Sequence, residues 1–305
     1  MSYRYLGKRK TMWLIISGLL LVPGILSLIF WKLPLGIDFR GGGTAEWQFA
    51  KSVTDQQLRD TLGEQGILKG FSVSSSGEGS VFVKFLPIEV GEYQKSFATI
   101  KEKYGQATEL KFENVGPSVS KDLTKKAIIA VVIASLFILV YLAYSFRGVT
   151  YPVSSWRFGS VALIALLHDV AISIGVFSIL AHFFGYEVDS SFITATLTIM
   201  GFSVHDTIVV FDRIRENLHG KNIDTAEQFE QIAESSLAQT LNRSLGTSLT
   251  LIFTLVALLL LGGQTIKPFV LMMTVGVAVG TYSSIFTATP LLTIWQSKIF
   301  SRAKK

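Results

Sequence analysis

The sequence predicts a polytopic α-helical membrane protein with six transmembrane helices and a small α+β domain outside the membrane. Of the 305 residues, 49% are hydrophobic and only 16% are charged, whereas a soluble domain carries about 25% charged residues. The apolar residues gather into six runs, and about 20 such residues suffice to cross a bilayer as a helix. The runs cover approximately residues 11–30, 126–146, 159–181, 191–211, 242–262 and 268–295. The polar segment between the first two runs is long enough to fold separately.

The first apolar run follows basic residues, as the core of a secretory signal peptide would. We interpret it as an uncleaved first span, because it is too long for such a core and no A-x-A-like cleavage site follows it. The preceding basic residues are Arg4, Lys8, Arg9 and Lys10.

Six spans place both termini on one side of the membrane. The short segments on that side are rich in basic residues, whereas the short loops 182–190 and 263–267 on the other side carry only Lys267. Basic short loops mark the cytoplasmic side, so we predict cytoplasmic termini and place residues 31–122 outside. Besides the N-terminal four, the basic residues behind this prediction are Arg147, Arg157, Arg213, Arg215, Lys221, Lys298, Arg302, Lys304 and Lys305.

The outside domain is predicted to have the order β-α-β-β-α-β, which is typical of ferredoxin-like folds. Alternating apolar residues predict strands at 44–49, near 70–74, at 81–85 and at 108–114. One helix is predicted over 54–65, where Thr54 and Gln57 have capping-box spacing, and another over 90–104, ended by Gly105. No catalytic cluster is visible in this domain, so a binding or gating role is favoured over enzymatic activity.

The chain thus divides into an N-terminal part with the first span (1–30), the outside domain (31–122) and a five-helix region (123–305) with a cytoplasmic connector at 212–241. In the connector, Asp224 and Glu227 have the spacing of a capping box. Apolar residues then recur at helical spacing, namely Ala226, Phe229, Ile232, Ala233 and Leu237. A packing helix is favoured here over a dedicated partner site.

The fourth run contains an acidic residue, Asp206, where the chain should lie in lipid. A carboxylate at the centre of a membrane helix costs about 2.5–3.5 kcal/mol on insertion scales, and such residues usually serve ion or proton movement. Asp206 lies roughly 9 Å from the cytoplasmic end of its span, and Arg243 reaches a similar depth from the next span. An ion pair between them would keep Asp206 charged, and its separation would let Asp206 bind a proton. The alternative is a static salt bridge in which Arg243 reaches toward the interface.

The third run contains a second acid, Asp169, roughly 15 Å from the cytoplasmic face, preceded by His168. Asp169, Asp206 and Arg243 would form a ladder of the kind found in proton relays. Neighbouring helical residues point about 100° apart, so we do not expect His168 and Asp169 to face one cavity together. His168 and His205 are relay candidates, with structural hydrogen bonding between helices as an equal alternative. The two His and two Asp lack i,i+4 ligand spacing, so no metal site is expected.

Several other functions are not supported. The chain has no cysteine, hence no disulfide and no thiolate metal site. It has no Walker A, HExxH or GxSxG pattern, so neither ATP hydrolysis nor protease chemistry is expected, and no cofactor is expected. The formal net charge of +6 follows the topology, and without a basic stripe interleaved with aromatic residues we expect no nucleic-acid binding.

The sixth run carries Gly276 and Gly280, followed by Thr281, Ser283 and Ser284. Small residues four apart allow two helices to approach closely. We favour packing within the bundle over a dimer interface.

Six motifs occur in a characteristic order along nearly the whole chain. They are LGIDFRGGG (35–43), VGPSVS (115–120), LHDV (167–170), GFSVHDTIVVFDRIREN (201–217), QTLNRS (239–244) and GTYSSIF (280–286). In order and spacing they resemble the SecD/SecF family of bacterial protein-export membrane proteins, within the resistance-nodulation-division (RND) superfamily.

The resemblance implies that the chain is half of an RND-type bundle in the bacterial cytoplasmic (inner) membrane. A SecD-type partner would supply the other six spans. The two subunits would use the proton motive force to promote translocation of unfolded preprotein through the SecYEG channel, after insertion driven by SecA. YajC and YidC are further expected partners, membrane lipid surrounds the spans, and no enzymatic activity is expected.

The resemblance also implies the site residues. Asp206 and Arg243 match the family's proton-coupling pair. The motif at the junction of membrane and domain matches Gly36, Asp38, Gly41 and Gly42, with structural coupling as the implied role. His205 stands where the family often has Asn, which puts a titratable imidazole beside the acid. Both proton and sodium coupling are compatible with these residues.

Two other functions are compatible with the sequence. Half of an RND-type exporter of small molecules would need an apolar, aromatic-lined pocket in the outside domain, for which residues 31–122 form a small domain. A structural scaffold for membrane-protein assembly would tolerate neutralisation of Asp206.

Overall fold

The computed structural model describes residues 9–50, 53–77, 79–147 and 153–303. It divides into two compact units. One unit comprises the described parts of Met1–Pro34, Ala130–Glu187 and Ser191–Lys305, and the other comprises Leu35–Ile129 with Val188–Ser190. Arg4, Lys8, Lys304 and Lys305, which entered the prediction of orientation, lie outside the described residues.

Six helical segments of the described chain are long and apolar enough to cross a membrane, which confirms the predicted number of spans. They are α1 (Lys10–Phe30), α5 (Pro117–Ser145), α6 (Ser155–Phe184), α7 (Ser190–Leu218), α8 (Ala226–Leu261) and Lys267–Ser301. The sixth segment consists of α9 (Lys267–Ser283), a π-helical turn (Ser284–Ala288) and the start of α10 (Thr289–Ala303). The short 3₁₀ helix η2 (Gln264–Ile266) precedes it.

The connector helix and the fifth span form one continuous helix, α8. Its first turn is closed by a capping box in which Thr225 accepts from the amide of Gln228, and the side chain of Gln228 accepts from the amide of Thr225. The predicted pair of Asp224 and Glu227 is therefore wrong by one residue. A hydroxyl with Gln three residues later makes the reciprocal bonds, and the amide of Asp224 donates to the same Gln228 oxygen.

The apolar stripe of the connector packs into the bundle, as favoured from the sequence. Phe229, Ala233 and Leu237 are buried in the same core as residues of α6 and α7, and Ile232 packs against that core. This part of α8 is therefore a packing helix.

Two pairs of helices in the bundle approach each other at glycines. α1 packs along α6, and a Cβ added to Gly175 of α6 would lie 2.4 Å from the Cα of Gly24. α9 packs against α7 in the same way. A Cβ added to Gly276 of α9 would lie 2.3 Å from Ile199, and one added to Gly280 would lie 3.2 Å from Ser203. The contact of α9 with α7 confirms packing within the bundle, whereas the contact at Gly175 was not anticipated.

Replacing Gly175 by alanine is expected to lower the free energy of unfolding by about 1–3 kcal/mol, since overpacking forces backbones apart. Gly159→Ala in the same helix is the matched control, because nothing lies within 4 Å of its Cβ position. Unfolding of both variants is compared in detergent with that of the unmodified chain. If both variants were equally stable, α1 and α6 would not be in backbone contact.

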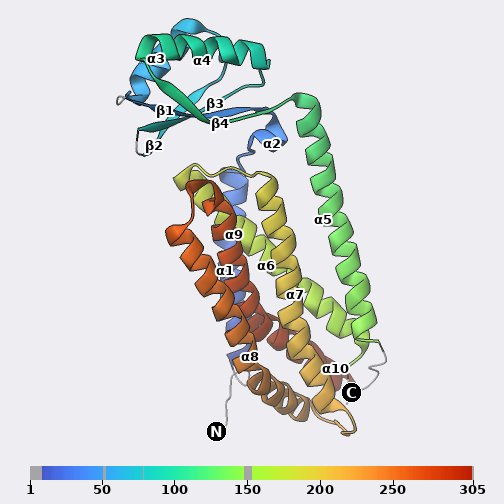
Figure 1. The fold of residues 1–305 in the computed structure, drawn as a ribbon. Helices are drawn as coiled ribbons and strands as arrows, with labels where there is room; N and C mark the ends of the chain where they lie inside the picture. The colour runs from blue at the N-terminus through green and yellow to red at the C-terminus, as the bar shows by residue number, and fades with distance from the viewer. Residues whose placement is uncertain (1–8, 51–52, 78, 148–152, 304–305) are drawn as a thin grey trace. The chain divides into compact units, whose positions relative to one another are not determined.

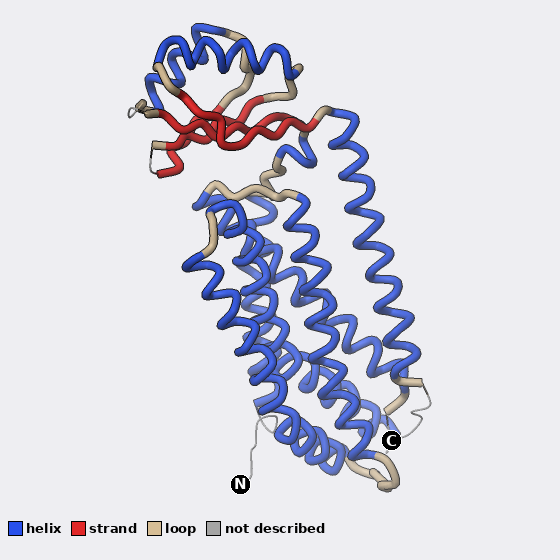
Figure 2. The backbone as a smooth tube through the Cα atoms, in the orientation of Figure 1, coloured by secondary structure: helices blue, strands red, loops and turns tan. Residues whose placement is uncertain are grey.

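The second unit contains all strands of the described chain (Figure 2). Its elements are α2 (Ile37–Arg40), β1 (Gly42–Phe49), α3 (Asp55–Gln65), β2 (Ser72–Gly77), β3 (Ser80–Phe85), α4 (Val90–Tyr104) and β4 (Ala107–Val115), and it also includes the start of α5. The strand order is β2-β3-β1-β4, and each neighbouring pair is antiparallel. α3 and α4 cover one face of the sheet (Figure 1). This is the predicted ferredoxin-like order.

The helix ends and the alternating strand predicted for this unit are present in the structure. Thr54 and Gln57 make a reciprocal capping box at the start of α3, and α4 ends at Gly105, which has a φ of 80°. On β1, Trp47 and Phe49 are buried while Gln48 between them is exposed. Each large apolar side chain that is fully buried contributes about 1.5–3 kcal/mol, so this alternation holds the helices on the sheet.

Candidate functional site

Asp206 lies inside the helical bundle and is only 5% exposed. Its Oδ2 accepts a hydrogen bond of 2.7 Å from Oγ of Ser284. No basic side chain in the described part of the chain forms an ion pair with it. Asp206 is therefore a buried acid whose partner is a hydroxyl.

The predicted ion pair between Asp206 and Arg243 is not formed in this structure. Arg243 is exposed, and its guanidinium contacts no acidic group among the described residues. α8 instead buries Thr240, Ser244 and Ser248 against the bundle. Arg243 is turned about 100° away from Ser244 around the helix axis. Of the predicted series of Asp169, Asp206 and Arg243, the basic residue therefore lies outside the buried site.

Asp169 on α6 is completely buried and has three hydrogen-bond partners. Its Oδ1 lies 2.8 Å from Nδ1 of His168. Its Oδ2 accepts from Oγ of Ser203, at 2.6 Å, and from Oγ of Ser283. These partners come from α6, α7 and α9, so one carboxyl group joins three helices.

His168 and Asp169 face each other, which makes the expectation that they would point apart wrong. The Cα–Cβ bonds of these adjacent residues point in different directions, but the side chains bend toward each other, so the imidazole and the carboxyl group are in contact. Nε2 of His168 lies 3.3 Å from the main-chain oxygen of Ser17. A carbonyl only accepts, so Nε2 carries a hydrogen. His168 Nδ1 and Asp169 consequently share one proton.

Sequence reasoning missed the serines that connect the acids. Ser283 donates to Asp169 and Ser284 donates to Asp206, so two consecutive residues of the sixth span hold acids from two other spans. Ser203 completes the group from α7. The available signal was a pair of adjacent hydroxyls in an apolar run, which we interpreted only as close packing.

His205 does not join this cluster. It lies on the exposed face of α7 while Asp206, the next residue, is buried. Its ring makes no hydrogen bond or ion pair in the part of the chain that the structure describes. A role for His205 beside the acid stays a prediction.

The junction motif forms the short helix α2 and the two glycines that lead into β1. The amide of Gly36 donates to the carbonyl of Val188 at 2.8 Å, and Oδ2 of Asp38 accepts at 2.8 Å from the amide of Ser190, the first residue of α7. Gly41 and Gly42 have φ of 76° and 134°, which other residues rarely adopt. Asp38 thus satisfies an amide at the start of α7, where negative charge is also favourable.

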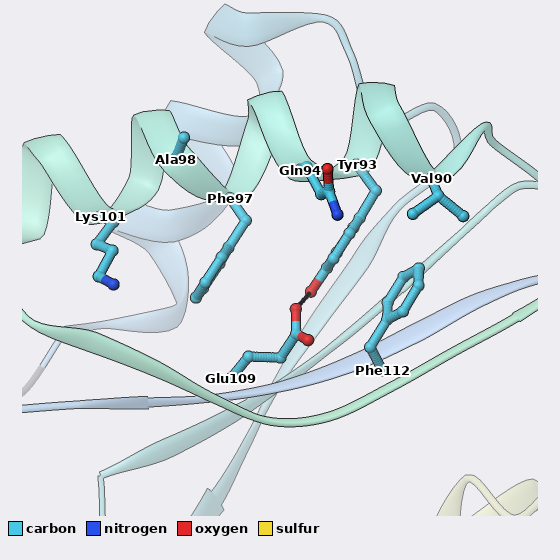
Figure 3. A pocket seen from close by; sticks show the side chains of 8 residues that line it. All are labelled: Val90, Tyr93, Gln94, Phe97, Ala98, Lys101, Glu109 and Phe112. Atoms are coloured by element: carbon cyan, nitrogen blue, oxygen red, sulfur yellow. Dashed lines mark hydrogen bonds between the residues drawn. The ribbon is translucent and has the colours of Figure 1, made fainter.

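A second candidate site is a groove of about 270 Å³ between α4 and β4 (Figure 3). It is lined by Val90, Tyr93, Gln94, Phe97, Ala98, Lys101, Glu109 and Phe112. The hydroxyl of Tyr93 donates to Glu109 and accepts from Nε1 of Trp47 at 3.0 Å. The groove is thus aromatic, with an internally satisfied polar pair.

Burial, together with the hydrogen bond to Glu109, raises the pKa of Tyr93 above its ordinary value of 10.0. The unfolded chain therefore loses this proton first, and the free energy of unfolding is expected to fall as pH rises above about 10. Tyr93→Phe should remove this part of the pH dependence. At neutral pH it should cost about 1–3 kcal/mol, because Trp47 Nε1 loses its acceptor. Denaturation of the full chain at several pH values measures both effects, and an unchanged pH slope would contradict this assignment.

Fold and site together define a polytopic helical membrane protein with buried acids within its spans and one ferredoxin-like domain. Residues 95–298 match the family model "Protein export membrane protein SecD/SecF, C-terminal". Together with the relatives described next, this match shows that the chain belongs to the SecD/SecF family, as a SecF-type subunit of the protein translocase.

The curated relatives span nearly the whole chain. The protein translocase subunit SecF of Thermobaculum terrenum is 44% identical over 94% of this chain and 92% of its own length. The SecF subunit of Anaerolinea thermophila is 38% identical over 96% of this chain and 94% of its own length. These relatives are transport subunits by name.

Solved structures share the fold. The crystal structure of SecDF, a translocon-associated membrane protein from Thermus thermophilus, matches 96% of this chain with 31% identity and a TM-score of 0.80. SecDF in the super-membrane-facing form matches 99% of it with 29% identity and a TM-score of 0.66. This chain spans only 38% and 40% of the lengths of those two chains.

Proposed function

We propose that this chain couples ion movement across the bacterial cytoplasmic membrane to the completion of preprotein export. The observation that carries the proposal is the pair of buried acids on two spans, Asp169 and Asp206, held by consecutive serines. A buried carboxylate without a cation is costly in its charged form. Binding of a proton or a cation at Asp206 offsets that cost, so occupancy of the site can shift a conformational equilibrium.

The partners follow from the family. A SecD-type subunit supplies six further spans, in keeping with the longer SecDF chains of which this chain covers a part. The complex acts on unfolded preprotein at the SecYEG channel after SecA has driven insertion, with YajC and YidC as further partners. Both termini lie in the cytoplasm and residues 31–122 lie outside, where their movement acts on the emerging preprotein.

Arg243 belongs to this proposal as the partner of Asp206 in another state. In this structure the two are separate, and Arg243 lies one residue from the buried Ser244 on α8. Separation of the pair is the arrangement in which Asp206 is free to bind an ion. Rotation or displacement of α8 would be needed to bring the two together.

A small-molecule exporter is the second candidate, because the groove on α4 and β4 is aromatic-lined as that function requires. Its volume of about 270 Å³ lies just below the range of ligand pockets, which is roughly 300–1,000 Å³. Membership of the SecD/SecF family favours preprotein export over efflux of small molecules. Copurification separates the two: Sec components support export, and an outer channel or adaptor supports efflux.

The test compares preprotein export in spheroplasts with the chain present or depleted, and with the ion gradient intact or collapsed. We expect the chain to increase completed export only when a gradient is present. Selective collapse of the proton gradient or the sodium gradient identifies the ion. Equal stimulation without either gradient would contradict coupling.

A further inference from the structure

The sixth span contains a π-helical turn, Ser284–Ala288, next to both buried acids. Such turns are rare and often lie at functional sites. The wide turn is held by Oγ1 of Thr289, which donates to the carbonyl of Ser284 five residues earlier at 3.0 Å. Pro290 follows and has no amide hydrogen, so it donates no main-chain hydrogen bond in either the wide turn or a regular turn. It therefore does not favour the regular helix over the wide turn.

Three hydrogen bonds link this turn to the acids, two of them directly and the third through Ser17 and His168. Ser283, the residue before the turn, donates to Asp169, and Ser284, its first residue, donates to Asp206. On the far side of the turn, Thr287 Oγ1 lies 2.7 Å from Oγ of Ser17. The main-chain oxygen of Ser17 is the partner of Nε2 of His168, which in turn faces Asp169.

Each of the two serines has a second acceptor ready in its own helix. Ser283 Oγ lies 3.1 Å from the carbonyl of Gly280, and Ser284 Oγ lies 3.0 Å from the carbonyl of Thr281. A charged carboxylate accepts the serine proton more strongly than a neutral carbonyl does. When the carboxylate binds a proton, the new carboxyl O–H can donate to the serine oxygen, and the serine hydroxyl turns to its helix carbonyl.

We propose that Ser283 and Ser284 are positioning residues that convert proton binding at Asp169 and Asp206 into a change of the π-turn. This inference rests on the proposed ion coupling and names the element that transmits it. Conversion of a π-turn to regular helix shifts the register by one residue. That rotates α10 by about 100° and moves it about 1.5 Å relative to α9.

Among the described residues, few other titratable groups contact the turn. Lys10 of α1 pairs instead with Glu230, and Arg157 of α6 with Gln296 of α10. α6 contributes His168 and Asp169, α7 contributes Asp206, and Tyr282 of α9 lies 3.2 Å from Oγ of Ser17. Arg243 and His205 are on exposed faces. The pH response of the turn is therefore assigned to the two acids and the proton shared with His168.

The first test measures how the gradient-driven share of export depends on external pH. Ser284→Ala removes a donor that favours the charged carboxylate. We expect its pH midpoint to differ from that of the wild type, and Ser284→Thr, which keeps the hydroxyl, to restore the wild-type midpoint. Ser297→Ala is the matched control, since its hydroxyl donates only to the carbonyl of Thr293 at 2.8 Å. A wild-type midpoint in Ser284→Ala would overturn the inference.

The second test measures rotation of α10 directly. The chain has no cysteine, so Leu292→Cys, at a completely buried position of α10, carries the only thiol in that variant. Thiolate formation alone makes every labelling rate depend on pH, so the rate is divided by that of Ser301→Cys, an exposed position of the same helix. We expect this ratio to change with pH, and the added changes Ser283→Ala and Ser284→Ala to abolish the change. If Ser284→Ala does not assemble, this measurement is made with both serines intact. A labelling ratio that is independent of pH then overturns the inference.

Asp206→Asn in the same export assay separates this inference from the function on which it rests. If that variant keeps gradient-driven export, the proposed coupling fails. If it loses gradient-driven export while both serine variants behave as wild type, the coupling stands and the role of the π-turn fails.

Discussion

Replacing Asp206 by asparagine is expected to abolish the gradient-dependent share of export and to leave the gradient-independent share intact. Asparagine has the same shape, and its amide oxygen can still accept from Ser284, so the bundle should assemble. It cannot bind and release a proton. Pulse-chase export in spheroplasts, with and without a gradient, measures the two shares separately.

The matched control is Asp212→Asn on the same helix. Asp212 is exposed and pairs with Arg215 three residues later, and surface pairs of this kind contribute only about 0–1 kcal/mol. The control should export like wild type. If Asp206→Asn also exported like wild type under a full gradient, Asp206 would be a structural residue, as the scaffold hypothesis holds.

Replacing Asp169 by alanine is expected to have the largest effect on stability, a loss of about 3–5 kcal/mol. The change leaves His168, Ser203 and Ser283 without their common acceptor inside the bundle. Thermal unfolding of the purified complex in detergent measures the loss, with Asp212→Ala as the exposed control. A loss below about 1 kcal/mol would mean that the three donors find other partners.

Asp169→Asn separates stability from function at the same position. With Nε2 of His168 bonded to Ser17, its Nδ1 can accept a hydrogen bond from an asparagine amide. The variant should therefore retain most of its stability, yet it cannot share a proton with His168. We expect gradient-driven export to fall while unfolding stays close to wild type, and a loss of both together would favour a purely structural role.

Much of the fold could be predicted because its signals are local. The apolar runs have the length of membrane spans, and the reciprocal bonds of Thr54 and Gln57 depend on residues three apart. The alternation around Trp47 likewise depends on neighbours in the sequence. Such patterns are fixed before any tertiary contact forms, so they predict six spans and a β-α-β-β-α-β domain.

The site was harder to predict because it depends on how helices rotate against one another. The sequence predicts similar depths for Asp206 and Arg243, but a rotation of about 100° decides whether a side chain faces a partner or the surface. α8 turns Ser244 inward and leaves Arg243 exposed. Sequence reasoning also gave weight to charged residues, while the groups that contact the acids are hydroxyls of Ser203, Ser283 and Ser284. In an apolar run these look like ordinary packing residues.

The most direct test of the central claim, that the buried acids carry ion coupling, is ion flux in proteoliposomes. The chain and its SecD-type partner are reconstituted around a pH-sensitive or a sodium-sensitive dye, and the corresponding proton or sodium gradient is imposed. We predict that the wild-type complex dissipates one of these gradients and that the Asp206→Asn complex, reconstituted equally well, does not. Equal flux through both complexes would contradict the claim.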